Sequence, residues 1–154
     1  MEKIEINNGK LKFERPRDFR IFSRRDFEAL NRSFKGNEWA CKSEEKHFLF
    51  DITWKKVPML GGNAPIEKVA KNTEKTVAKR VPVYGKVEDV KRYIAGQEAA
   101  GFRYTYVVDD IEQMAEYIVV KIDGDLYAFS CIGRTETFDN YYNTFAKMLD
   151  SVEA

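Results

Sequence analysis

The C-terminal third of the chain places the tightest limits on its fold. Residues 114–122 and 126–132 have the apolar alternation of strands and flank Asp123-Gly124, which favours a tight hairpin because glycine adopts positive φ without penalty. After Thr137, a residue suited to cap a helix, apolar side chains recur with helical spacing. These side chains are Phe138, Tyr141, Tyr142, Phe145, Leu149 and Val152. The pattern predicts a hairpin covered by a helix, with the aromatic stripe in the core and not in a ligand site.

The remaining segments extend this α+β pattern. Asn7-Asn8-Gly9 separates two short strands, and Pro16 ends the second because proline has no backbone donor. Pro65 suits the first turn of a helix. We expect strands at residues 3–6, 10–13, 38–43, 46–55 and 102–108, and helices at 26–34 (starting near Ser23 or Asp26 and ending at Gly36-Asn37) and 66–80.

Residues 86–100 fit two interpretations. Four apolar residues between Val87 and Ile94 have helical spacing, whereas the same stretch followed by Ala95-Gly96 also fits a strand and a turn. We favour the strand, because an antiparallel meander follows.

Length and composition indicate one domain that spans residues 1–154. Charged residues make up 33% of the chain, as expected of a domain with a solvated surface. Residues 1–92 carry 22 basic and 14 acidic side chains, whereas residues 93–154 carry four and eleven. This asymmetry fits either a basic binding face or two halves that neutralise each other in space, and we favour the second.

The cysteines and the single histidine indicate neither a disulfide nor a metal site. Cys41 and Cys131 are expected to be buried free thiols of a cytoplasmic protein. The charged first residues do not resemble a signal peptide, and a secreted protein would follow only if a leader had been removed. His47 falls on the polar side of its strand, so we expect no metal or catalytic role for it and no cofactor.

Two segments combine residues that catalysis can use. Leu60-Gly61-Gly62-Asn63 precedes a helix, whose N-terminus can hold phosphate, but the segment lacks the lysine of a P-loop. Asp109, Asp110 and Glu112 can bind a cation or share a proton, although solvated acids are usual at a turn. Asp123 and Asp125 are explained by their own turn.

Residues 15–25, the arginine–aromatic segment, are the densest mixture of basic and apolar side chains. Arginine next to aromatic rings is typical of contacts with nucleic acids and proteins. The alternative, which we favour, is a solvated segment whose phenylalanines enter the core. The segment contains Arg15, Arg17, Arg20, Arg24 and Arg25 with Phe19, Ile21 and Phe22.

The closing segment follows a pattern known from one superfamily. It consists of the turn Ile122-Asp123-Gly124-Asp125, a strand that starts Leu-Tyr-Ala-Phe, and a helix that ends Met148-Leu149-Asp150-Ser151-Val152. Leu11-Lys12-Phe13 with Arg15-Pro16 and Phe19 adds a looser match near the start. These residues resemble the PsbP-like superfamily, which includes the PsbP subunit of photosystem II, a nuclear import factor that binds Ran, and bacterial families of unknown function. The resemblance implies an antiparallel sheet with helices on both faces, an α/β/α sandwich, and a non-enzymatic binding role.

The leading hypothesis is a bacterial PsbP-like domain that binds another protein as an adaptor, with no catalytic residue and no assigned binding residue. A specific form is a chaperone for a secreted effector, which requires an apolar groove on the sheet. One alternative is a carboxylate- or phosphate-handling enzyme that gathers the acids near 109–112 or the amides near 61–66 in a pocket. Another is nucleic-acid binding through residues 15–35. The absence of a Ser–His–Asp grouping favours binding over catalysis.

Overall fold

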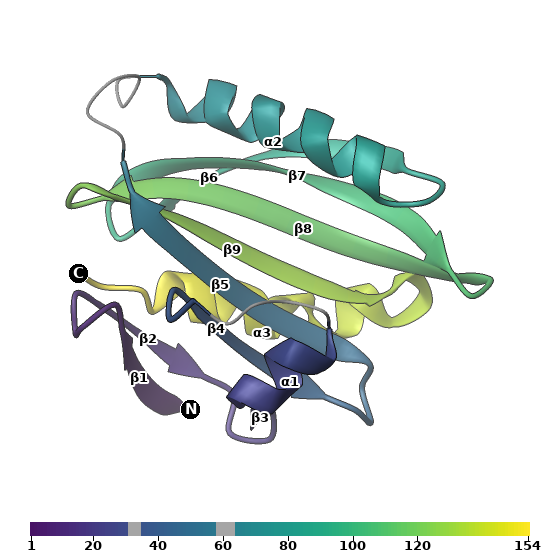
Figure 1. Ribbon diagram of the computed structural model, residues 1–154, viewed down its shortest axis with the longest axis horizontal. Coiled ribbons are helices and arrows are strands. Elements are labelled where there is room, and N and C mark those ends of the chain that lie inside the picture. Colours follow the sequence, from purple (N-terminus) through teal and green to yellow (C-terminus); the bar gives the residue numbers. More distant parts are fainter. Residues whose placement is uncertain (31–34, 58–63) are drawn as a thin grey trace.

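The computed structural model describes residues 1–30, 35–57 and 64–154, and its centre is one antiparallel sheet between two helices (Figure 1). The sheet has seven strands in the order β3-β4-β5-β9-β8-β7-β6. Helix α2 covers one face and helix α3 covers the other, which is the α+β sandwich that the sequence predicted. A separate hairpin, β1–β2, lies beside α3.

The elements have the following bounds. The hairpin consists of β1 (Glu2–Ile6) and β2 (Leu11–Arg15). The main sheet consists of β3 (Arg20–Ile21), β4 (Glu38–Ser43), β5 (Phe48–Lys56), β6 (Gly85–Ile94), β7 (Gln97–Val108), β8 (Ile111–Ile122) and β9 (Asp125–Arg134). The helices are α1 (Arg24–Ala29), α2 (Ile66–Arg80) and α3 (Phe138–Asp150), the last preceded by a 3-10 turn, η1 (Thr135–Thr137).

The main core lies between the sheet and α3. Phe138, Phe145 and Leu149 of the predicted stripe are buried, whereas Tyr141 and Tyr142 are half-buried. Phe145 stacks on Phe50 of β5, with ring centroids 5.8 Å apart. The aromatic stripe is therefore core, as its spacing predicted. Met148 is also fully buried and extends it.

A second core lies between the opposite face and α2. Ala70 of α2 packs with Ala100 and Val119 of the sheet, and the C-terminal part of the helix packs on Phe102 and Tyr104. The alternation along β7 thus turns its aromatic residues toward α2. Small residues beneath α2 bring the helix close to the strands.

Residues 86–100 form strands and not a helix. Strand β6 and the start of β7 are joined by a tight turn at Ala95-Gly96, where both residues have positive φ. Gly101 then lets β7 and β8 approach closely, because a Cβ at this position would collide with the carbonyl oxygen of Tyr117. The sheet consequently continues to β6 without a break.

The first helix is shorter than the sequence predicted. Helix α1 starts after Ser23, whose hydroxyl accepts a hydrogen bond from the Asp26 amide while the Asp26 carboxylate accepts one from the Ser23 amide, a capping box. It ends at Ala29, and Leu30 is its C-cap residue, whose amide donates a hydrogen bond to the Phe27 carbonyl at 3.1 Å. Helix α1 therefore ends before the predicted stop at Gly36-Asn37. Residues 31–34 themselves lie outside the described residues.

Two further predicted boundaries move, and one predicted helix cap is not formed. Strand β5 starts at Phe48, because the chain turns before it and His47 has a φ of 50°. Strand β8 starts at Ile111, since the turn consists of Asp109 and Asp110 alone. Thr137 precedes α3 as expected, but its side chain makes no capping hydrogen bond because it belongs to the 3-10 turn η1.

Candidate functional site

A groove of about 290 Å³ opens on the sheet face that carries α2, at the end next to α1. Phe22 and Leu30 flank the groove on the α1 side. Five strands of the sheet contribute most of its other lining residues, which strand pairing places in two rows. The first row is Lys42, Leu49 and Ile132, and the second, two residues further along β9, is Arg134, Gln113 and Tyr106. Sheet register, and not a local motif, therefore assembles this surface.

The middle of the groove is apolar and its rim is basic. Leu49, Ile132 and Tyr106 are half-buried, and Leu30 is 49% exposed. Burial raises the pKa of Tyr106, so its hydroxyl stays protonated and can donate a hydrogen bond.

Three basic side chains lie around the apolar middle of the groove: Lys42, His47 and Arg134. The Lys42 ammonium lies 3.4 Å from the Glu44 carboxylate, whereas His47 and Arg134 have no ion pair with any described residue. No acid is among the described lining residues. The groove thus suits an apolar group that carries negative charge beside it.

The arginine–aromatic segment contributes less to a surface than its composition suggested. Phe19 is buried and stacks on Phe50 at 4.9 Å, as the favoured interpretation expected. The Arg15 guanidinium donates to the Phe19 carbonyl at 2.7 Å and to the Glu2 carboxylate at 2.5 Å. Arg20 pairs with Asp26 at 2.7 Å. Arg15 and Arg20 are therefore held by these intramolecular partners. Arg17, Arg24 and Arg25 are exposed.

The other sequence-derived candidates lie apart from the groove. Asp109 and Asp110 form an exposed turn, and Glu112 is exposed at the start of β8. Asp110 and Glu112 share a shallow hollow with Arg134, which separates the hollow from the groove. The predicted phosphate-binding residues, 60–63, lie outside the described residues. Asp123 is the exposed first residue of the β8–β9 turn, as expected.

The two cysteines are buried free thiols. Burial raises the pKa of the Cys41 thiol to about 12 and raises the pKa of Cys131 well above its ordinary value. Neither thiol is therefore suited to act as a nucleophile in the folded protein.

A buried ion pair that the sequence analysis missed joins α3 to the sheet. The Glu116 carboxylate is fully buried and accepts hydrogen bonds from Arg103 at 3.0 and 3.2 Å and from the Tyr142 hydroxyl at 2.8 Å. The guanidinium also lies 4.5 Å from the centre of the Tyr142 ring and 5.0 Å from that of Phe138. Burial, followed by the charge of Glu116, raises the pKa of Tyr142 to about 12. Every charge in this cluster has a partner, so its role is to position α3.

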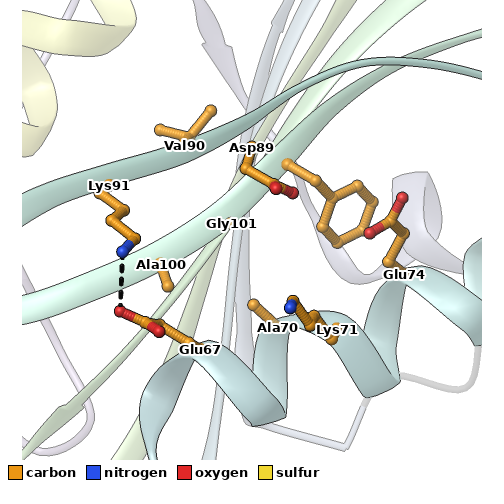
Figure 2. Close-up of a pocket in the computed structure, with 10 residues that line it drawn as sticks. Glu67, Ala70, Lys71, Glu74, Asp89, Val90, Lys91, Ala100 and Gly101 are labelled. Atoms are coloured by element: carbon orange, nitrogen blue, oxygen red, sulfur yellow. Dashed lines mark ion pairs between the residues drawn. The ribbon is translucent and has the colours of Figure 1, made fainter.

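Figure 2 shows a smaller hollow, of about 150 Å³, between α2 and strands β6 and β7. Its floor is made of small residues, Ala100 and Gly101 of β7. The Glu67 carboxylate lies 3.0 Å from the Lys91 ammonium, drawn as a dashed line, and so links α2 to β6. Glu74 accepts a hydrogen bond from the Tyr84 hydroxyl at 2.8 Å. Because these side chains pair with one another, they fix α2 against the sheet and are less available to a ligand.

The described residues show neither a metal centre nor a membrane span. No three histidine, cysteine or acidic side chains of residues 1–30, 35–57 and 64–154 come close enough to hold a metal ion. Within the same ranges, no helix has the length and apolarity needed to cross a bilayer.

Solved structures share this architecture at low sequence identity. A cyanobacterial PsbP (CyanoP) from Synechocystis sp. PCC 6803 has a TM-score of 0.70 and 14% identity, covering 99% of this chain and 91% of its own. LpqN from Mycobacterium tuberculosis, involved in cell envelope biogenesis, has a TM-score of 0.68 at 8% identity, covering 99% and 88%. The Saccharomyces cerevisiae Ran-binding protein Mog1p has a TM-score of 0.62 at 6% identity, covering 99% and 94%. The sequence matches no protein-family model and no curated protein.

An antiparallel sheet with one helix on each face and a hairpin beside the closing helix defines an α+β sandwich. The matches over nearly the whole chain identify this sandwich as the PsbP-like fold. The resemblance drawn from the closing segment is therefore confirmed at the level of fold.

Proposed function

We propose that this chain is a non-enzymatic protein-binding module and that the groove beside α1 is its docking site. The observation that carries the proposal is the combination of an apolar floor with a basic rim. Leu49, Ile132 and Tyr106 form the floor, and His47 and Arg134 are the basic rim residues without a described ion-pair partner. Partially exposed apolar side chains on a rigid sheet, ringed by polar groups, are typical of interaction surfaces.

The partner is an acidic protein segment that inserts one or two apolar side chains. A volume of about 290 Å³ accommodates that many side chains but not a long unfolded chain. The adaptor form of the hypothesis is therefore better supported than the chaperone form. Carboxylates beside the inserted side chain would face Arg134 and His47, which gives the contact its orientation.

The structural neighbours are compatible with this role. One of them, Mog1p, is described as a Ran-binding protein, so the fold can present a surface to another protein. Because one fold hosts many functions, this likeness supports the class of function and does not identify the partner. The two free cysteines agree with the expected cytoplasmic location, where thiols stay reduced.

The first test is selection of peptides from a random display library on the purified protein. The enriched peptides should carry a large apolar residue next to Asp or Glu. Enrichment of basic or purely polar peptides would contradict the proposal.

The second test locates the binding site of an enriched peptide by titration against variants. Leu49→Asp should weaken binding by about thirtyfold, the effect of losing a central contact. Arg134→Glu should weaken binding by several-fold, and more at low salt, because it reverses a rim charge. Val83→Asp and Arg25→Glu are the matched controls, since both residues are exposed and neither lines the groove. Equal losses in the controls would place the binding site elsewhere.

A further inference from the structure

The outer edge of β6 is long and open to solvent. Strand β6 ends the strand order of the sheet, and no described strand pairs with its outer side. Helix α2 packs mainly on β7 and β8, and α3 packs on β9, β2 and β5, so neither helix covers the outer side of this edge, although Glu67 of α2 and Asp150 of α3 reach Lys91 and Arg92. Val87 and Tyr93, at its two ends, are 48% and 67% exposed. An edge of ten residues is a ready template for another strand.

The β6–β7 hairpin determines which backbone groups face outward. Its two-residue turn, Ala95-Gly96, is closed by the pair Ile94 and Gln97. The closing pair of such a hairpin is hydrogen-bonded, and hydrogen-bonded and non-bonded pairs then alternate along the strand. The amides and carbonyls that point away from β7 therefore belong to Asp89, Lys91 and Tyr93.

We propose that two copies of this chain pair through their β6 edges, antiparallel and across a two-fold axis at Val90. In this register Asp89 exchanges backbone hydrogen bonds with Lys91 of the second copy, which uses the outward-facing groups. It also places the carboxylate of Asp89 opposite the ammonium of Lys91, and Glu88 opposite Arg92 on the other face of the joined sheet. Within one copy each of these side chains already has an ion-pair partner, so the cross-copy pairs share those charges; the partners are Lys86 for Asp89, Glu67 for Lys91, Arg103 for Glu88 and Asp150 for Arg92. Two-fold symmetry repeats both pairs, so four pairs of opposite charge form.

Neighbouring registers are unfavourable. A two-fold axis at Asp89 would oppose that carboxylate to its own copy, and an axis at Lys91 would oppose two ammonium groups. A shift by one residue would bring inward-facing amides to the interface and would mismatch the two faces of the sheets. The charge order of β6 is thus complementary to itself in the Val90 register and repulsive in the adjacent symmetric ones. A row of charges of one sign would have been enough to protect this edge from pairing, whereas β6 carries charges of both signs.

The ends of the interface add apolar contact. In the Val90 register, Val87 of one copy lies at the level of Tyr93 of the other. The β-bulge between Lys86 and Glu88 ends the regular ladder at this point. Both exposed apolar side chains thereby gain a neighbour. This surface is the outer side of β6, a strand that contributes no residue to the groove beside α1, so the dimer does not depend on the proposed docking function.

Charge reversal tests the proposed register by sedimentation velocity over a concentration series. The unmodified protein should show a monomer–dimer equilibrium. Asp89→Lys and Lys91→Asp should each raise the dimer dissociation constant by about tenfold or more, since two attractive cross-strand pairs become repulsive. Mixing the two variants should restore association, because every Lys then faces an Asp. A monomer at all concentrations, or a dimer insensitive to both reversals, would overturn the proposal.

A disulfide at the symmetry axis provides a second readout. Val90→Cys places two thiols opposite each other in a non-bonded pair, whose Cα separation of about 4.5 Å allows a disulfide. Oxidised glutathione should convert this variant to a covalent dimer. Tyr93→Cys is the control, because residue 93 of one copy faces residue 87 of the other and not its own equivalent. Equal dimer yields from the two variants would refute the Val90 register.

Discussion

Replacing Glu116 by glutamine should destabilise the protein through the charge left on Arg103. The change keeps the size of the side chain and one acceptor oxygen, but it removes the negative charge opposite a guanidinium that is only 16% exposed. Because Glu116 itself is fully buried, water does not replace the lost interaction. The perturbation therefore isolates the electrostatic part of the link between α3 and the sheet.

The expected loss of stability depends on how many stabilising contacts the Arg103 guanidinium keeps. Removing one partner of a buried pair costs about 3–5 kcal/mol. The rings of Tyr142 and Phe138, 4.5 and 5.0 Å from the guanidinium, still stabilise the cation. We therefore expect the lower end, about 3 kcal/mol, which corresponds to a fall of about 6–12 °C in Tm for a chain of this size.

Urea unfolding followed by the fluorescence of Trp39 and Trp54 measures this loss. The double variant Arg103→Met with Glu116→Leu should be more stable than Glu116→Gln, because it leaves no buried charge. Tyr142→Phe should cost about 1.5 kcal/mol, the value of one hydrogen bond to a charged group. A free energy of unfolding for Glu116→Gln within about 1 kcal/mol of the unmodified protein, or a double variant less stable than the single one, would refute the reasoning.

Three further outcomes are expected. Gly101→Ala should lower the free energy of unfolding by about 3 kcal/mol, because its Cβ meets the Tyr117 backbone. Gly36→Ala is the control: its Cβ has free space but its φ is +78°, so it should cost about 1 kcal/mol. Similar losses in the two variants would contradict the close approach of β7 and β8 at Gly101. Cys41 and Cys131 should resist a disulfide reagent in the native protein, because burial raises both pKa values, and should react in denaturant; native reaction at the unfolded rate would disprove their burial. On heparin the protein should elute like a neutral control, since internal partners hold two arginines of the arginine–aromatic segment; retention to high salt would instead support nucleic-acid binding.

The sequence predicted those parts of the fold that depend on local periodicity. The turn at Asp123-Gly124, the helix from Ile66 to Arg80 and the stripe of α3 all follow from the spacing of neighbouring residues. The predicted length of α1 was too great because Phe34 continues the apolar spacing of the sequence past Leu30, the C-cap residue of the helix. Spacing defines a face but does not show where backbone hydrogen bonds stop.

The groove and the buried ion pair depend on register, which local patterns do not reveal. Glu116 and Arg103 are 13 residues apart and become direct neighbours only when β7 and β8 pair. For the groove one signal was present: Leu49 is an apolar residue on the side of β5 that otherwise carries Asp51 and Thr53. An apolar residue on the otherwise polar face of a strand indicates a surface that another group covers.

The first hairpin is completed by the far end of the chain. Lys12 of β2 exchanges two backbone hydrogen bonds of 2.8 Å with Glu153, and Ser151 accepts one from the Glu14 amide. During translation, β1 and β2 therefore leave the ribosome well before the residues that hold them exist. Until then Leu11 stays accessible to chaperones and proteases, although it is fully enclosed in the finished protein.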